Sequence, residues 1–521
     1  MLRGERGWRL FFRVCHESQH SAAKLHVEAE LKAWRENHYA LCENRFTLWR
    51  ATPIGAESGA RVKPMNTAFL SELMNTIADR GRSLLGLPAP SIDPVMRAAG
   101  LAELCERLLS GRGEASGRAL AREMLDILAS LDDAGRLSFY AALALRFGPD
   151  EDALVRAVQA WNKDPDEDNA GRLHYASEPR RQEIFRRLNR APGGTAALVA
   201  MRADLLARLK AHPELKPLDR DLVHLFNSWF NRGFLVLRRI DWSSPALILE
   251  KIIRYEAVHQ INGWDDLRNR IDPPDRRCYA FFHPALLDEP LIFVEIALSQ
   301  TIPAAVQPLL AQDRTPCALA EARTATFYSI SNCQQGLAGV SFGNFLIKQV
   351  VEELRRELPG LETFVTLSPA PGFMAWLRAQ ENQGKLEGLS MEEAQVLESL
   401  DDPDWPQDQD FSARARALLE PLAARYFLEA RNGSNKPVDP VARFHLGNGA
   451  GLERINWLGD TSEKGLAESA GLMVNYLYDL SRIEENHEAF ANQSEIVASS
   501  AVRRLLKTGG RGRLTNVVAG R

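Results

Sequence analysis

The sequence predicts an α+β protein with two domains, a helical domain followed by a mixed domain of strands and helices. From about residue 65 to residue 230, apolar residues recur with a helical period, as Leu101, Leu104, Cys105 and Leu108 do. After about residue 230, short runs of β-branched and aromatic residues alternate with helical patterns. The 521 residues are enough for more than one domain.

The domain boundaries follow changes in composition. Residues 1–64 are an N-terminal extension that ends in a linker, because residues 51–64 contain Pro, Gly and Ser. We expect the helical domain at 65–230, the mixed domain at 231–505 and a basic tail at 506–521. The basic stretch at 503–513 is expected to be disordered.

The first half of the mixed domain predicts a strand, a helix and a hairpin. The strand is at 234–240, and the helix at 244–258 begins with Ser244 as N-cap and Pro245 in its first turn. Strands at 278–283 and 291–298 are separated by a short loop, which favours an antiparallel hairpin.

The second half predicts two strands around a helix. The strands are at 326–331 and 363–367, and the helix between them is at 344–357. The polar segment 379–410 is interpreted as a surface insertion.

Residues 326–348, TFYSISNCQQGLAGVSFGNFLIK, place a glycine loop between the strand and the helix. Gly336, Gly339 and Gly343 would let the backbone approach an anion, and the N-terminus of a helix offers free N–H groups. The glycine spacing fits neither a Walker loop nor a dinucleotide-binding fingerprint. The loop therefore indicates a phosphate site, with a ligand-free turn as the alternative.

Two later segments each present a side chain suited to polar chemistry. Ser368 follows a β-rich run and precedes Pro369 and Pro371, which lack N–H groups and end the strand. Ligands of open sheets bind at such strand ends. His445 lies among small and polar residues, and a histidine can titrate near neutral pH. A buried histidine without a function is the alternative reading.

Several separated motifs together resemble the malonyl-CoA decarboxylase family, over roughly residues 230–480. They occur in the same order as in that family, which makes the match specific. In chain order they are YEAVH (255–259), RRCYAFFH (276–283), FYSIS-x-x-QQGL-x-GV (327–340), LSP-x-PGF (367–373), FHL-x-NGA (444–450), RINW (454–457) and GLM-x-NY (471–476).

The resemblance implies a helical domain followed by a catalytic domain similar to the acetyltransferase (GNAT) fold. It implies that Ser368 and His445 are catalytic, with His445 as the proton donor, and that Tyr478 lies near them. It also implies substrate contacts from Asn448 and from the glycine loop, whose residues are Ala338, Gly339, Val340, Ser341, Phe342, Gly343 and Asn344. Animal members have an acidic residue at the position of Ser341, so a carboxylate role there is in doubt.

The implied reaction converts malonyl-CoA to acetyl-CoA and CO2. Loss of CO2 leaves an enolate, whose oxygen needs hydrogen-bond donors and whose α-carbon needs a proton. Ser368 would orient the departing carboxylate. A thioester delocalises the charge, so the reaction requires no cofactor. A GNAT-like acyl-CoA N-acyltransferase is the alternative, and a non-enzymatic acyl-CoA sensor is a third reading.

Composition excludes several classes of protein. The net charge of −4 gives no basic field for nucleic acid, and no apolar run approaches the length of a membrane span. Six scattered cysteines without C-x-x-C favour reduced thiols. We expect a cytoplasmic protein, with the mitochondrial matrix as the alternative. The helical domain carries no site of its own, which favours a homo-oligomer formed through it.

A competing motif lies near the N-terminus. His16, Glu17 and His20 form H-E-x-x-H, and His26 stands at the third-ligand position of a zinc protease. On an ideal helix, however, His26 lies about 120° around the axis from His20. The glycine that would turn the chain is Ala23 here. We therefore expect no metal site.

Overall fold

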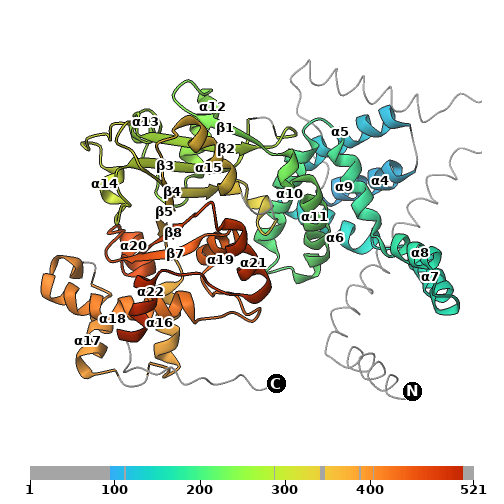
Figure 1. Cartoon of the computed structure of the whole chain (residues 1–521). Helices are drawn as coiled ribbons and strands as arrows, with labels where there is room; N and C mark the ends of the chain where they lie inside the picture. The colour runs from blue at the N-terminus through green and yellow to red at the C-terminus, as the bar shows by residue number, and fades with distance from the viewer. Residues whose placement is uncertain are drawn as a thin grey trace, which may run out of the picture. The chain divides into compact units, whose positions relative to one another are not determined.

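The computed structural model describes residues 94–110, 113–286, 288–340, 346–386, 389–402 and 404–508. The described chain begins with a group of helices and continues into a sheet flanked by further helices (Figure 1). Ile92–Arg521 form one compact unit. The predicted α+β class, with the helices first, is therefore confirmed. The predicted extension at 1–64, with its H-E-x-x-H motif, lies outside the described residues.

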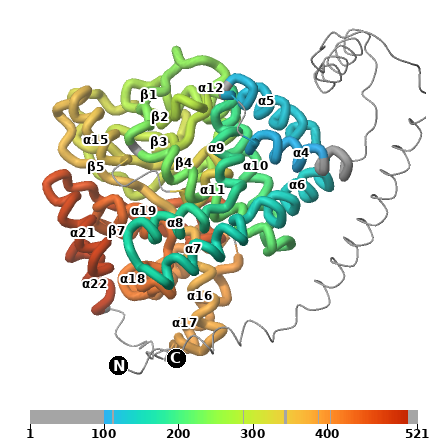
Figure 2. Tube along the Cα trace, turned by 90° about the vertical axis from the view of Figure 1, so that its right-hand side faces the viewer, coloured from blue at the N-terminus to red at the C-terminus, as the bar shows by residue number. Residues whose placement is uncertain are grey.

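The helical region packs around the predicted apolar stripe, and Leu101, Cys105 and Leu108 are buried in it. Asp132, Asp150 and Asp166 each cap a helix by accepting a hydrogen bond from a backbone N–H three residues later. Figure 2 shows α7 and α8 side by side. The helices are α4 (Pro94–Leu109), α5 (Glu114–Ser130), α6 (Asp133–Arg146), α7 (Glu151–Lys163), α8 (Glu167–Ser177), α9 (Arg180–Asn189), α10 (Gly194–Arg208) and α11 (Lys216–Trp229).

The described residues of the second region form one mixed sheet of eight strands, in the order β1-β2-β3-β4-β5-β8-β6, with β7 paired to β8. The predicted hairpin is present, because β2 and β3 pair antiparallel, whereas β4 and β5 pair in parallel. The strands are β1 (Val236–Ile240), β2 (Arg276–Phe282), β3 (Pro290–Ser299), β4 (Thr324–Asn332), β5 (Thr363–Thr366), β6 (Ser368–Pro369), β7 (Gly451–Asn456) and β8 (Met473–Leu477).

Strands β4 and β5 separate at the end of their parallel pairing. Their register ends at Phe327 opposite Thr366, and the Leu367 N–H still donates to the Phe327 carbonyl. Ser368 and Pro369 then pair with β8. Pro369 has no N–H to continue the ladder, as predicted. The second half of β4 therefore has no ladder partner on this side among the described strands.

The two faces of the sheet carry different cores. On β3, Val294 and Ile296 belong to a large apolar cluster that also contains helical-region and α15 side chains. Phe293, which directly precedes Val294, belongs to a second cluster with α12 and α13 side chains. Successive strand side chains point to opposite faces. The helical region and α15 therefore cover one face, and α12 and α13 cover the other.

Eleven further helices surround the sheet in the described residues. They are α12 (Ala246–Tyr255), α13 (Trp264–Ile271), α14 (Gln307–Leu310), α15 (Leu346–Glu357), α16 (Phe373–Asn382), α17 (Met391–Ser399), α18 (Gln409–Leu428), α19 (Pro440–Gly447), α20 (Glu463–Ser469), α21 (Ile483–Gln493) and α22 (Ser500–Thr508).

Three local predictions were wrong. Pro245, with extended backbone, is the N-cap of α12, while the Ser244 hydroxyl accepts a hydrogen bond from the Asp241 N–H instead. The segment 379–410 is not simply a surface insertion, because it contains α17, which buries Val396. The basic stretch from 503 begins inside α22. Paired apolar and basic residues recur there with a helical period and form an amphipathic helix, which the basic composition concealed.

Candidate active site

Ser368 lies where the sheet divides. It follows β5 after Leu367, whose side chain packs into an apolar cluster with Tyr328. Thr366 and Ser368 are two residues apart in extended chain, so their side chains share a face. Their hydroxyl oxygens are 2.9 Å apart, and both residues are buried.

His445 reaches Ser368 from α19. The helix begins with Asp439, whose carboxylate accepts a hydrogen bond from the Ala442 N–H at 2.7 Å, and Pro440 occupies the first turn. His445 lies about one and a half turns along, where its ring is buried. His445 Nε2 is 3.0 Å from Ser368 Oγ. The two predicted residues therefore form one hydrogen-bonded pair, although they are 77 positions apart in the chain.

Two tyrosines hold the histidine ring. The Tyr478 hydroxyl lies 2.9 Å from His445 Nδ1. The Tyr476 ring stacks on the imidazole, with ring centroids 4.6 Å apart and planes inclined by 24°. The Tyr476 backbone N–H also donates to Thr366 Oγ1 at 3.2 Å. The structure thus brings together all three predicted catalytic side chains, Ser368, His445 and Tyr478.

The electrostatics of this group are those of a dry, uncharged site. Burial lowers the pKa of His445 to about 3. Burial also raises the pKa of Tyr478 above its usual value. Both groups are therefore neutral at pH 7, and the nearest contacts are hydroxyls and aromatic rings.

A pocket of about 420 Å³ lies beside this group. Of the predicted substrate-binding residues, Ala338, Gly339, Val340 and Asn448 line it. Ser341, Phe342, Gly343 and Asn344 lie outside the described residues. The remaining lining residues are Leu291, Ile292, Asn332, Gln334, Gln335, Leu337, Leu346, Arg443, Phe444 and Gly447.

The pocket adjoins the histidine through α19. Phe444 and Gly447 flank His445 in sequence and line the pocket. In the loop that also lines the pocket, Gly339 has a φ of +75°, a conformation that favours glycine, and a Cβ added to it would meet no atom within 4 Å. The loop therefore presents bare backbone to open space, as a loop that receives a ligand requires.

The helical region supports this loop, a feature that sequence reasoning missed. A Cβ on Gly336 would lie 1.9 Å from the Val199 carbonyl oxygen of α10. The buried Arg202 donates to the Gly336 carbonyl at 2.7 Å and forms an ion pair with Asp219 of α11 at 2.8 Å. The loop and α10 are thus in backbone contact. No local pattern indicates this pairing, because Arg202 and Gly336 are 134 positions apart.

Sequence reasoning also missed Thr366 and Tyr476. Each lies two residues before a predicted site residue, Thr366 before Ser368 and Tyr476 before Tyr478. The two-residue period of extended chain was the signal that could have found them.

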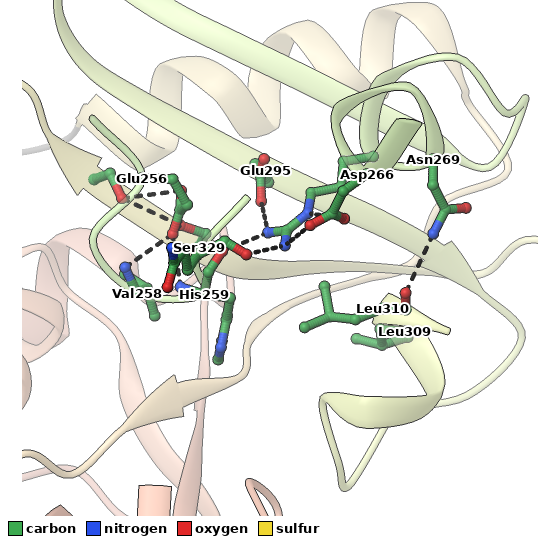
Figure 3. Close-up of polar contacts among 12 residues, drawn as sticks. Glu256, Val258, His259, Asp266, Asn269, Glu295, Leu309, Leu310 and Ser329 are labelled. Carbon is green, nitrogen blue, oxygen red and sulfur yellow. Dashed lines mark hydrogen bonds and ion pairs between the residues drawn. The ribbon is translucent and has the colours of Figure 1, made fainter. Parts of the chain in front are cut away.

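A second buried polar cluster lies on the other face of the sheet (Figure 3). Arg270 of α13 donates to Asp266 at 3.0 Å and to Glu295 of β3 at 3.2 Å. Nearby, the Glu256 carboxylate accepts hydrogen bonds from Ser329 at 2.8 Å and from the His259 N–H at 2.8 Å. The predicted helix at 244–258 ends at Tyr255, which frees Glu256 and His259 for this arrangement.

A larger cavity, of about 970 Å³, lies in the helical region and is lined partly by Arg146, Arg220 and His224. None of the predicted site residues lines it. The smaller pocket is the candidate site, because it is lined both by the glycine loop and by residues that flank His445 on α19.

The described residues contain no group of three His, Cys, Asp or Glu side chains placed to hold a metal ion. None of their helices is long and apolar enough to cross a membrane.

Family models match both regions of the chain. The model described as the malonyl-CoA decarboxylase C-terminal domain matches residues 233–516. The model of the N-terminal domain of the same family matches residues 147–230.

Individual relatives agree with the family models. The mitochondrial malonyl-CoA decarboxylase of Anser anser anser is 37% identical over 395 residues, which are 71% of this chain and 76% of that protein. The corresponding protein of Rattus norvegicus is 37% identical over 64% of this chain and 73% of its own length.

Solved structures agree as well. The crystal structure of malonyl-CoA decarboxylase from Rhodopseudomonas palustris is 58% identical and has a TM-score of 0.76. That from Agrobacterium vitis is 54% identical, with a TM-score of 0.75. Each alignment covers 78% of this chain and 99% of the solved chain.

Proposed function

Because this chain belongs to the malonyl-CoA decarboxylase family and is therefore a carboxy-lyase, we propose that Ser368 and His445 carry its chemical step. The substrate is malonyl-CoA and the products are acetyl-CoA and CO2. The observation that carries the proposal is the 3.0 Å contact between two buried side chains beside a glycine-lined pocket.

Ser368 orients the carboxylate that leaves. The bond between the carboxylate carbon and the α-carbon breaks, and its electron pair moves into the thioester to give an enolate while CO2 departs. A hydroxyl that donates to the carboxylate holds that bond perpendicular to the thioester plane, where the electron pair is delocalised. The dry surroundings favour the step, because CO2 and the delocalised enolate need less solvation than a carboxylate.

His445 supplies the proton that completes acetyl-CoA. In the free protein the ring is neutral, because burial lowers the pKa of His445 to about 3. An anionic malonyl group beside the ring favours the protonated form, so substrate binding raises the pKa again. The proton then passes from Nε2 to the α-carbon. Tyr478, bonded to Nδ1, keeps the ring oriented throughout.

The pocket holds the coenzyme A part of the substrate. Ala338, Gly339 and Val340 offer backbone to its phosphates or pantetheine arm, and Asn448 contributes from α19. Ser341, Phe342, Gly343 and Asn344 stay predicted substrate contacts, since they lie outside the described residues. The chemistry assigned to these residues requires no cofactor or metal, since the thioester itself delocalises the enolate charge.

The wider organisation follows the sequence. The helical domain at 65–230 forms the contacts of a homo-oligomer, the GNAT-like domain at 231–505 carries the reaction, and 1–64 and 506–521 are accessory. The protein acts in the cytoplasm, with the mitochondrial matrix as the alternative, since relatives are named mitochondrial.

The test is turnover of malonyl-CoA by purified variants, followed by mass spectrometry. Ser368→Ala and His445→Gln should each reduce kcat by about 10²–10⁴-fold, the scale of a lost acid–base or charge-stabilising group. His174→Gln, at an exposed position on α8, is the matched control. Near-normal kcat in either site variant would remove that residue's role. Acyl transfer to an added amine, without acetyl-CoA in its absence, would favour the N-acyltransferase alternative.

A further inference from the structure

We propose that Arg443 of α19 binds a phosphate group of the coenzyme A moiety, together with the backbone of the glycine loop. The proposal deepens the proposed function and rests on it for the identity of the ligand. Arg443 is a binding residue that selects a phosphorylated carrier, and it takes no part in the chemical step. Its contribution to affinity can be measured without turnover.

Arg443 is the only charged residue among the described residues that line the pocket. The other lining side chains are apolar or carry amides, apart from the glycines. Amides and backbone N–H groups can donate to a phosphate, but they do not neutralise its charge. Coenzyme A carries a 3′-phosphate and a pyrophosphate, so it brings several negative charges. This pocket therefore offers one cation to a strongly anionic ligand.

The guanidinium of Arg443 is fixed in place but not neutralised. Its Nη1 donates to the carbonyls of Pro437 at 2.7 Å and Val438 at 2.8 Å. No carboxylate of the described residues forms an ion pair with it, and the Asp439 carboxylate accepts from the Tyr426 hydroxyl at 3.0 Å instead. Neutral carbonyls orient the group and leave its charge in place. The arginine is therefore held ready for an anion from outside the protein.

Three N–H groups of Arg443 remain for that anion. A guanidinium has five, and the two carbonyls take both hydrogens of Nη1. The hydrogens on Nε and Nη2 have no acceptor among the described residues, and these two nitrogens stay accessible. The Nε–H and one Nη2–H are parallel in a guanidinium and match two oxygens of a phosphate. The free edge is thus the one that binds phosphate in a bidentate manner.

The place of Arg443 on α19 separates it from the reacting atoms. Arg443 and Gly447 are four residues apart, as are Phe444 and Asn448, so these four form one stripe along the pocket. Successive residues of an α-helix differ in direction by about 100°, so Arg443 and His445 project from nearly opposite sides of α19. Arg443 therefore faces a part of the ligand other than the malonyl carboxylate, which leaves the phosphates as its partner.

Calorimetry with CoA tests binding on the free protein. Arg443→Gln should raise the Kd of CoA by about 10–100-fold, the value of a charge-assisted pair of hydrogen bonds. Arg416→Gln is the matched control and should leave the Kd unchanged, because Arg416 is exposed on α18, pairs with Glu420 and does not line the pocket. An unchanged Kd in Arg443→Gln would overturn the proposal.

The same measurement with 3′-dephospho-CoA identifies the phosphate. A loss of affinity in Arg443→Gln that persists with this ligand assigns the contact to the pyrophosphate. A loss that disappears with it assigns the contact to the 3′-phosphate. Either result supports the proposal, since both groups belong to the coenzyme A moiety.

Kinetics separate this role from a structural one. If Arg443 only supported the start of α19, its loss would displace His445 and lower kcat with every substrate. We expect instead that Arg443→Gln raises the KM for malonyl-CoA by about 10–100-fold and changes kcat less than about threefold. With malonyl-pantetheine, which has no phosphate, kcat/KM should stay within about threefold of the parent value. An equal loss with both substrates would overturn the proposal.

Arg443→Lys provides the test if Arg443→Gln does not fold. Lysine keeps the positive charge but lacks the bidentate edge, so the Kd of CoA should rise by about 3–10-fold. A Kd equal to that of the parent would overturn the proposal. Failure of the proposed function has a different signature. A parent protein that binds CoA through Arg443 but does not decarboxylate malonyl-CoA would retain the phosphate contact and lose the assigned reaction.

Discussion

The sheet carries two buried polar centres, one on each face, and they are built on different principles. On the face covered by α12 and α13, Arg270 joins two carboxylates and two backbone carbonyls, and Glu256 accepts from two serines. On the other face, Ser368, His445 and Tyr478 contact one another through single hydrogen bonds, with aromatic rings around them.

The difference separates a structural centre from a reactive one. Arg270, the cation of the first centre, is held by two carboxyl groups and two backbone carbonyls, so moving it would leave a buried charge uncompensated. The second centre contains no group ionised at pH 7, so an arriving substrate charge meets donors that are not already neutralised by a counter-ion. Paired charges therefore mark the structural centre, and the absence of paired charges marks the reactive one.

The largest effect should come from breaking the charged centre. Arg270→Met leaves Asp266 without its cation and Glu295 without its hydrogen-bond donor, and we expect the free energy of unfolding to fall by about 3–5 kcal/mol. Arg268→Met, at an exposed position in the same helix, should cost at most about 1 kcal/mol. Urea titration at pH 7 measures both. An Arg270→Met protein as stable as its Arg268 control would make this centre dispensable.

Acid should weaken both centres through their histidines. Burial lowers the pKa of His445 to about 3 and that of His259 to about 4. Between about pH 6.5 and those values, only the unfolded chain takes up the proton, so stability falls as pH falls, by roughly 1.4 kcal/mol per pH unit for each histidine.

Replacing one of these histidines should therefore flatten the dependence. His445→Gln should retain about 2 kcal/mol more of its pH 7 stability at pH 5 than the parent protein does, by the same relation. Exposed His174→Gln should leave the slope unaltered. Chemical denaturation at several pH values between 5 and 7.5 makes the comparison, and identical slopes in all three proteins would contradict it.

Within the neutral centre, loss of one hydroxyl should affect rate more than stability. Tyr478→Phe removes the hydroxyl that contacts His445 Nδ1, and we expect kcat to fall roughly tenfold, the value of one hydrogen bond. Tyr328→Phe is the control, because its buried hydroxyl has no partner among the described residues. Equal kcat in the two variants would show that the contact to Nδ1 does not matter for the reaction.

The smallest effect should come from Glu295. Burial, together with the nearby Glu256, raises the pKa of Glu295 to about 8, so the carboxyl is mostly protonated at pH 7. Glu295→Gln replaces a neutral acid with a neutral amide, and stability near pH 4.5 should change by less than about 1 kcal/mol. Between about pH 4.5 and 8 only the unfolded parent chain ionises Glu295, so the parent loses stability as pH rises through this range and the variant gains relative to it; above pH 8 the difference should stay constant. A loss comparable to that of Arg270→Met would mean that Glu295 is ionised.

Much of the fold and of the candidate site could be predicted from the local sequence. Strand and helix positions in the mixed domain followed from apolar period and proline placement, and motif resemblance selected Ser368, His445 and Tyr478. The structure brings these three into contact, although their catalytic roles stay predictions. The pocket contains the described part of the predicted loop, Ala338–Val340.

The missed features depend on contacts between distant segments. Arg270 and Glu295 are 25 positions apart, on a helix and a strand. Arginine and glutamate are usually exposed, and both are buried here because α13 packs on the sheet. The prediction of the α12 N-cap was wrong for a local reason. Ser244 and Pro245 both suit the start of a helix, and the Ser244 hydroxyl accepts a hydrogen bond from the Asp241 N–H instead.

The close packing of Gly336 against α10 limits where the chain can be cut into fragments. A fragment that began after α11 would keep the sheet, the serine–histidine pair and the whole pocket lining. It would lose Val199 and Arg202, and with them the surface against which Gly336 and Leu337 are buried. The sequence pattern therefore changes near residue 230, but the two parts on either side are not structurally independent. A chimera that joins this half to the helical domain of another protein would need a surface that packs closely against Gly336.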